Sequence, residues 1–216
     1  METNEEARAA RDDEDLPRVA SAQMRLEVRE DWRGNAAAAD GLARATFHLS
    51  VVPHALRLEI QARAFGDPPP STPPGRQPGL WGFEVVELFL LGEDERYLEL
   101  EFGPHGHWLA LSLRGPRGLE HDDVMIDPSF RRPAATQGAN AERWSVAVDL
   151  PFEILPPAVA RLNAYTIDGM GEERRHWAWR AVPGPQPDFH RLERFAPLEP
   201  ELRVALERAR AAARGD

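Results

Sequence analysis

The chain of 216 residues carries 36 acidic and 26 basic side chains, a formal net charge of -10, and all of its basic residues are Arg. This acidic balance disfavours a nucleic-acid binder, which needs a basic face to neutralise phosphates. The lack of Lys excludes Schiff-base chemistry and a P-loop, and the lack of Cys excludes disulfides, thiolate nucleophiles, zinc ribbons and iron–sulfur clusters. The length suits one domain, and the 42% of apolar residues can fill its core.

The beginning of the chain is an acidic segment that we expect to be a disordered tail over residues 1–22. Its first twenty residues hold seven acids and three Arg, and they lack the basic start and apolar stretch of a secretory signal. No apolar run approaches the roughly 18 to 20 residues that cross a bilayer. We therefore expect a cytoplasmic protein that does not associate with a membrane.

Alternating apolar residues predict three strands in the next part of the chain, over residues 24–28, 45–51 and 56–63, with a hairpin turn at residues 52–54. Residues 65–80 hold six Pro and three Gly, which excludes regular structure. Because this connection is long for a compact domain, we expect either a mobile loop or a lid.

The middle of the chain predicts a three-strand meander. Residues 85–91 (VVELFLL) are apolar on both faces except for Glu87, as is typical of a central strand covered on both sides. Residues 97–102 alternate between apolar and polar, and a Gly-Pro-His-Gly turn at residues 103–106 leads into a strand over residues 107–113.

Weaker patterns predict strands over residues 124–126, 144–150, 162–167 and 176–181, and the Ala-rich residues 200–214 predict a helix. About nine strands without a βαβ rhythm favour an all-β fold, an antiparallel β-sandwich or jelly roll with a C-terminal helix. From these predicted elements we set the domain limits: the tail over residues 1–22, the sandwich over 23–198 and the helix over 199–216.

Three carboxylates are the first candidate site residues. Glu87 interrupts an apolar strand, where a carboxylate is costly unless it is paired with an Arg or faces a ligand, and both interpretations are open. Glu99 and Glu101 project from one side of their strand, so that with Glu87 they resemble the paired acids of a glycosidase. Alternation on a solvent-facing strand gives the same spacing.

The second group of candidates is aromatic. Trp81 precedes the central strand, and Trp177 and Trp179 share one side of a late strand. Aromatic rings at strand ends can stack on the C–H faces of a sugar, although core packing explains Trp equally well. A binding cleft requires Trp81 and one of the late pair to face each other.

Histidines offer a weak signal for a metal site. His105, His107 and the segment His121-Asp122-Asp123 contain ligand types that bind metals, yet they lie in predicted turns, where solvated side chains are the commoner case. We therefore expect no metal and no cofactor.

Four motifs in order give the chain a family resemblance. Residues 80–91 (LWGFEVVELFLL) and 97–113 (YLELEFGPHGHWLALSL) resemble the DOMON-like domains related to family 9 carbohydrate-binding modules. The chain is most similar to a subfamily of small, stand-alone, uncharacterised proteins of bacteria and vertebrates. That subfamily's LP(W/F)-x-x-(L/F)PP motif, followed by an Asn-containing strand, matches residues 150–157 and Asn163, and its PDFH motif matches residues 187–190.

The resemblance implies a non-catalytic β-sandwich whose sugar-binding branch holds a sugar between two Trp. Trp81 and Glu87 match that branch's first Trp and its hydrogen-bonding carboxylate, and the second Trp corresponds to Trp177 or Trp179, of which we prefer Trp179. Where the branch has an Arg and an Asn on the next strand, this chain has Glu99 and Glu101.

Two further features follow from the resemblance. In the PDFH segment, Asp188, His190 and the following Arg191 converge either on a pocket or on a structural clasp that closes the last strand. Some DOMON domains bind haem through Met and His, and Met170 with His176 is the local pair of that kind.

The leading interpretation is a non-enzymatic module that binds a small saccharide or sugar-like metabolite by Trp stacking and carboxylate hydrogen bonds. Residues 65–80 would form a rim of the site. The alternative is a protein-interaction module with a vestigial sugar cleft, and a distant alternative is an enzyme that acts on glycosides.

Overall fold

The computed structural model describes residues 22–36, 42–131 and 143–215. The expected acidic tail lies outside these residues apart from Ala22. No helix among the described residues is long and apolar enough to cross a membrane.

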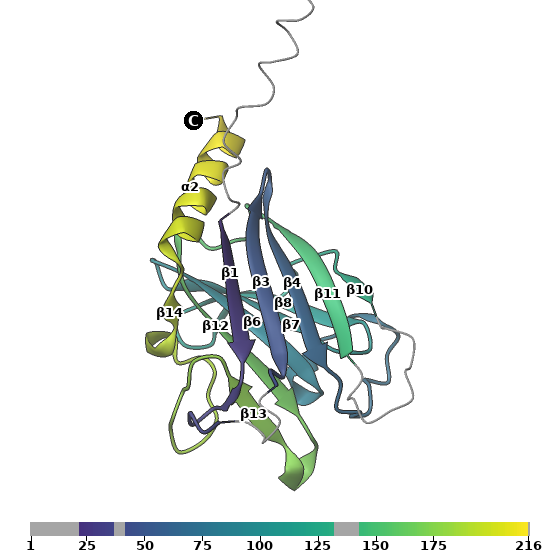
Figure 1. Ribbon diagram of the computed structural model, residues 1–216. Coiled ribbons are helices and arrows are strands. Elements are labelled where there is room, and N and C mark those ends of the chain that lie inside the picture. Colours follow the sequence, from purple (N-terminus) through teal and green to yellow (C-terminus); the bar gives the residue numbers. More distant parts are fainter. Residues whose placement is uncertain (1–21, 37–41, 132–142, 216) are drawn as a thin grey trace, which may run out of the picture.

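Two sheets stack face to face, with the strands of one crossing those of the other (Figure 1). Sheet A has the strand order β1 (Gln23–Val28), β3 (Ala45–Val52), β4 (Ala55–Arg63), β11 (Arg143–Pro151) and β10 (Ser129–Arg131). Sheet B has the order β2 (Glu30–Asp31), β13 (Arg175–Ala178), β12 (Val159–Asp168), β6 (Val85–Gly92), β7 (Arg96–Phe102), β8 (His107–Arg114) and β5 (Gly75–Arg76).

Two short strands extend sheet B, since β9 (Gly118–His121) pairs with β8 and β14 (Ala196–Pro197) pairs with β12. The described pairings are antiparallel except that between β5 and β8. Single 3-10 turns lie at η1 (Leu80–Gly82), η2 (Gly171–Glu173) and η3 (Leu192–Arg194).

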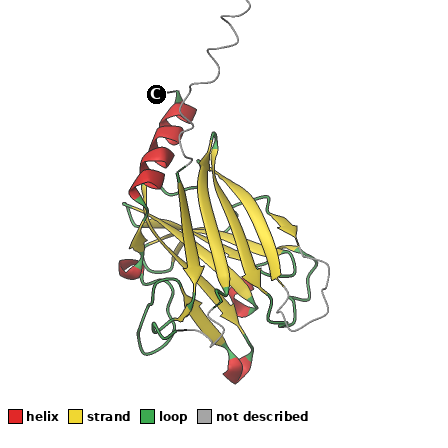
Figure 2. Ribbon diagram, in the orientation of Figure 1, coloured by secondary structure: helices red, strands yellow, loops and turns green. Residues whose placement is uncertain are grey.

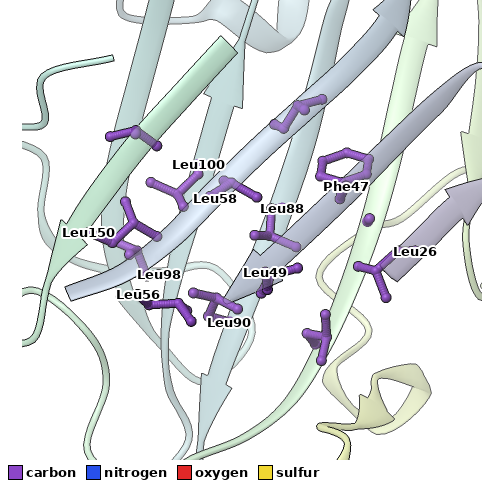
Figure 3. Close-up of a cluster of buried hydrophobic side chains, with 14 of the residues drawn as sticks. Leu26, Phe47, Leu49, Leu56, Leu58, Leu88, Leu90, Leu98, Leu100 and Leu150 are labelled. Atoms are coloured by element: carbon purple, nitrogen blue, oxygen red, sulfur yellow. The ribbon is translucent and has the colours of Figure 1, made fainter. Parts of the chain in front are cut away.

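The main core lies between the two sheets. Period-two alternation turns every second residue of each strand inward, and the inward side chains are almost all Leu, Phe, Val or Ile. Figure 3 shows the centre of this core, where the labelled side chains are at most 1% exposed: Leu26, Phe47, Leu49, Leu56, Leu58, Leu88, Leu90, Leu98, Leu100 and Leu150. Burying each such side chain contributes about 1.5 to 3 kcal/mol.

The outer face of sheet B carries a second apolar cluster. Phe89, Tyr97 and Tyr165 project from it, and Phe189 and Phe195 from the last loops cover them. The rings of Tyr165 and Phe189 stack with centroids 3.9 Å apart. The chain after β13 therefore forms a partial third layer, and sheet B is apolar on both faces.

The helix α2 (Pro200–Arg214) begins with Pro at its first turn and ends at Gly215 in the left-handed conformation, as helix-capping preferences predict. It contacts β1 and β3 and buries Leu202 and Leu206 in the main core. Figure 2 shows this one α-helix beside the strands.

The expected antiparallel β-sandwich with a C-terminal helix is confirmed. The longer strands were predicted to within a few residues, and the hairpin turn falls between β3 and β4. The strand expected at residues 124–126 is wrong: these residues form a loop between β9 and β10. Charged residues and Pro128 flank them; Ile126 is buried in the main core, and the partly buried Val124 packs against it.

Candidate functional site

An open pocket of about 700 Å³ lies on the outer face of sheet B, beside the part that the last loops cover. Its walls are mostly apolar side chains of β8, β9, β12 and the loop after β13: Leu111, Leu113, Leu119, Ile167, Pro187 and Phe189. A pocket of this volume accommodates a small organic molecule. The sequence candidates Trp81, Glu87, Glu99 and His190 also line it.

Two carboxyl groups from neighbouring strands line the pocket. Alternation along β6 turns Val86 and Leu88 inward to the main core and Glu87 outward, and in β7 it does the same for Glu99 and Glu101. Glu87 pairs directly with Glu101 across β6 and β7. Glu99 lies two residues along, so the three acids form one cluster on the same face of sheet B.

All three acids are buried, in contrast to the expectation of a solvent-facing strand for Glu99 and Glu101. Glu87 is 2% exposed, Glu99 4% and Glu101 0%, and Glu101 lies outside the residues that line the pocket. Burial raises the pKa of Glu99 to about 7. Burial, reinforced by the neighbouring acids, also raises the pKa of Glu87 and of Glu101 well above their ordinary value.

Trp81 stands at the edge of the pocket with 52% of its surface exposed. It belongs to η1, which begins after Gly79 in the left-handed conformation and which buries the adjacent Leu80. Arg174 fixes this turn, because its guanidinium donates hydrogen bonds to the backbone carbonyls of Trp81 and, over 3.1 Å, of Gly82. The half-exposed indole is therefore held in a defined place.

Exposed apolar side chains gather around the same pocket. Leu119 is 57% exposed and Met170 is 62% exposed, and both line the pocket together with Trp81. Such a concentration of exposed apolar side chains is typical of binding and interaction surfaces.

A hydrogen-bonded chain fixes His190 in the pocket wall. The backbone N–H of Arg117 donates to the Tyr97 hydroxyl over 3.3 Å, and Tyr97 Oη lies 2.7 Å from His190 Nδ1. Burial raises the pKa of Tyr97, so the phenol keeps its proton and its O–H donates a hydrogen bond to Nδ1. Burial also lowers the pKa of His190 to about 4, so we assign the neutral ring with its proton on Nε2.

Asp188 supports this wall from the side. Its Oδ1 accepts a hydrogen bond from Arg117 Nη2 over 2.7 Å and another from the backbone N–H of His190 over 3.1 Å. The PDFH segment thus both contributes Phe189 and His190 to the pocket and clasps the loop of Arg117.

Like Asp188, two more of the secondary candidates do not line the pocket. Asn163 is fully buried and uses its amide to hold the backbone of Arg180, with hydrogen bonds of 3.0 and 3.1 Å. Arg191 donates to the carbonyl of Pro183 and to Glu193. Both residues have a structural role, because their polar atoms form hydrogen bonds that hold the loop after β13 in place.

The late Trp pair does not face Trp81. His176 and Ala178 of β13 lie on the outer face of sheet B, so by alternation Trp177 turns to the opposite face and packs against the main core, as does Trp179. Trp177 Nε1 donates to Asp168 over 2.9 Å.

Trp179 instead borders a separate polar hollow. The guanidinium of Arg180 lies 4.3 Å from the centre of its ring, and the hollow is otherwise lined by charged residues of β1 and β2. The expectation that Trp81 and Trp179 enclose one ligand is therefore wrong.

The loop of residues 65–80 is tied to the sandwich, and none of its residues lines the pocket, so it does not form the expected rim. The carboxylate of Glu84 accepts the backbone N–H groups of Phe65 and Asp67 over 2.8 and 3.2 Å. His107 Nε2 lies 2.9 Å from the carbonyl of Thr72. The described residues include no group of three or more His, Asp or Glu arranged to hold a metal ion.

Sequence reasoning missed Arg117 and Arg174 in the pocket. Arg174 acts on backbone carbonyls, which leave no pattern in a sequence. The sequence singles out His176 only together with Met170, as a possible haem pair, and both residues line the pocket. Its alternation with Trp177 along the strand is the pattern that places the two side chains on opposite faces of sheet B.

The fold and the pocket define a β-sandwich protein with an open, ligand-sized site on the outer face of one sheet. A crystal structure of a "putative carbohydrate-binding protein" from Bacteroides uniformis has the same fold, with a TM-score of 0.56 and 16% sequence identity, covering 82% of this chain and 85% of that one. The chain belongs to the UPF0462 family, as its similarity to curated members shows. No family model matches it.

Three of the curated relatives that the chain matches are vertebrate proteins. The UPF0462 protein C4orf33 homolog of Mus musculus is 37% identical over 159 residues, which are 69% of this chain and 79% of the relative. The Danio rerio homolog is 40% identical over 151 residues, covering 65% and 72%. The Homo sapiens protein C4orf33 is 37% identical over 147 residues, covering 64% and 70%.

Proposed function

We propose that the pocket on the outer face of sheet B binds a small saccharide or sugar-like metabolite. The observation that carries this proposal is the meeting of a half-exposed indole, Trp81, with two buried carboxyl groups, Glu87 and Glu99, in one pocket of about 700 Å³. Indole faces stack on the C–H faces of sugars, and carboxyl groups exchange hydrogen bonds with hydroxyls. His190 Nε2 adds a donor from the wall.

Two likenesses support the proposal. The Bacteroides uniformis neighbour is described as a putative carbohydrate-binding protein, and the sequence resembles DOMON-like domains and family 9 carbohydrate-binding modules at Trp81 and Glu87. In this chain the partner of Trp81 is not a second Trp, so the opposite side of a bound sugar would contact Phe189 and the aliphatic wall of β8.

The role we propose is binding without catalysis. A glycosidase places its two carboxyl groups on either side of the scissile bond and keeps one of them ionised at the right moment. Here Glu87 and Glu99 come from adjacent strands of one sheet face, and burial raises the pKa of both. This arrangement supports a floor of hydrogen-bonding groups under a ligand.

The test is a calorimetric and tryptophan-fluorescence titration of the purified protein with mono- and disaccharides. We expect a saturable signal that Trp81→Ala weakens at least about tenfold, since a lost stacking contact with its buried area is worth over about 1.4 kcal/mol. Trp179→Ala is the matched control and keeps the wild-type affinity, because Trp179 lies outside the pocket.

Glu87→Gln separates a ligand contact from a structural role. The variant should lose affinity while it keeps its fold, because no described Arg forms an ion pair with Glu87. Absence of binding by every saccharide refutes the proposal. The exposed apolar group around Trp81 then favours the alternative of a protein-interaction surface.

A further inference from the structure

The acids at the floor of the pocket have no cation beside them. Glu87, Glu99 and Glu101 are each at most 4% exposed, and no ion pair among the described residues reaches them. By geometry, Oε2 of Glu99 and both carboxyl oxygens of Glu101 make no hydrogen bond within the described part of the chain, although Glu99 and the backbone of Trp81 lie close enough to Glu101 to shift its pKa. Buried carboxyl groups are normally paired with a cation or hydrogen-bonded. Without a cation these three stay largely protonated, and a cation bound beside them would stabilise their ionised form.

The cations nearest the pocket are engaged elsewhere. Arg117 pairs with Asp188 over 2.7 Å. Arg174 donates to the carbonyls of η1 and, over 3.2 Å, to that of Gly169. Arg117 lowers the pKa of Glu99 and Arg174 lowers that of Glu87, but in both cases burial has the larger, opposite effect.

We infer that the ligand of this pocket supplies the missing cation as a protonated amino group, which makes an amino sugar or a similar amine its class. An ammonium group offers three donors, and the carboxyl groups of Glu87 and Glu99, which both line the pocket, can accept them. The face of Trp81 adds a cation–π contact. The inference rests on the proposed saccharide site and names the substituent that the site recognises.

Other ligand charges fit the same floor less well. A sugar acid or sugar phosphate would bring a negative charge against three carboxyl groups. A neutral sugar would leave the cluster unpaired. A metal ion would need ligands placed around one point, and the described residues hold no such group.

The test is isothermal titration calorimetry of the full chain at pH 6.5 with D-glucosamine, D-glucose, N-acetyl-D-glucosamine and cyclohexylamine. The first three share one ring and differ in the substituent at one carbon, which is charged in glucosamine and neutral in the other two, while cyclohexylamine keeps the ring size and the charge without hydroxyls. We expect glucosamine to bind at least tenfold more tightly than glucose and N-acetylglucosamine. Glu99→Gln should reduce this preference to less than threefold, and Glu59→Gln on the exposed face of β4 should preserve it.

Each other outcome refutes either the cation inference, the saccharide site or both. Equal or tighter binding of the two neutral sugars overturns the cation inference and leaves the saccharide site standing. Binding of cyclohexylamine without any sugar supports the cation inference and overturns the saccharide site. Absence of binding by all four compounds overturns both. If Glu99→Gln retains the glucosamine preference, the floor acids are not its source and the inference fails.

Discussion

Replacing Glu99 with Gln should stabilise the protein at alkaline pH and leave its stability almost unchanged at pH 4.5. Burial raises the pKa of Glu99 from the ordinary value of 4.5 to about 7. Between these values the folded protein keeps a proton that the unfolded chain has already lost. Unfolding then releases protons, so the free energy of unfolding falls as the pH rises through this range. Gln removes the titrating group and with it this loss.

The magnitude follows from the same two values. The difference between 4.5 and about 7, at about 1.4 kcal/mol per pKa unit, corresponds to about 3 kcal/mol. The effect is absent below pH 4.5 and complete above pH 7. Because the side chain is 4% exposed, solvent screening takes little from this figure.

The assay is urea denaturation followed by tryptophan fluorescence at pH 4.5, 6, 7 and 8, for the wild type, Glu99→Gln and the control Glu59→Gln. Groups elsewhere in the protein titrate alike in all three, so the difference between variant and wild type isolates Glu99. The control on the exposed face of β4 should stay within about 0.5 kcal/mol of the wild type throughout. If Glu99→Gln is less stable than the wild type at pH 8, or if the difference does not grow with pH, the assignment of a buried, neutral acid is wrong.

Three further predictions concern other parts of the molecule. Asp168→Ala should lower the free energy of unfolding by about 3 to 5 kcal/mol in urea denaturation, since it removes the carboxylate partner of the buried Arg44; a loss below 1 kcal/mol would contradict this. The NMR titration of His190 should show a pKa of about 4. The contribution of the buried neutral ring to the free energy of unfolding is then present above pH 6.5 and is lost as the pH falls toward 4. A titration midpoint near 6.5 would exclude a buried neutral ring. Gly169→Ala should lower the thermal midpoint by an amount equivalent to about 2 kcal/mol or more, because φ is +81° and a Cβ would lie 2.3 Å from the carbonyl of Glu173; an unchanged midpoint would speak against that conformation.

Strand positions and the inward faces could be predicted from the sequence because alternation is a local property. Glu87 could be singled out for the same reason, since one carboxylate in an apolar strand conflicts with its neighbours. The burial of Glu99 and Glu101 could not be predicted, because it depends on residues distant in sequence from β7, among them Phe189 and His190 of the last loops and the turn η1. A segment distant in sequence decides whether an alternating strand faces solvent.

The error over Trp177 and Trp179 has a related cause. Alternation shows that the two side chains share one side of their strand, as they do in the structure. It does not show which side meets the core when both faces of a sheet are covered. The residues that position the site, Arg174 and Tyr97, act through backbone carbonyls and a single ring nitrogen, and such contacts exist only in the folded chain.

The two-sided burial of sheet B has a consequence for biosynthesis. Residues that cover its outer face, Val182, Phe189 and Phe195, leave the ribosome after every strand of the meander, and so does helix α2, which covers part of the main core. Until they emerge, the nascent chain presents Phe89, Tyr97 and their apolar neighbours to the cytosol or to a chaperone, as incompletely synthesised domains do. Translational pausing or truncation near residue 180 would therefore yield an aggregation-prone intermediate with the apolar outer face of sheet B exposed.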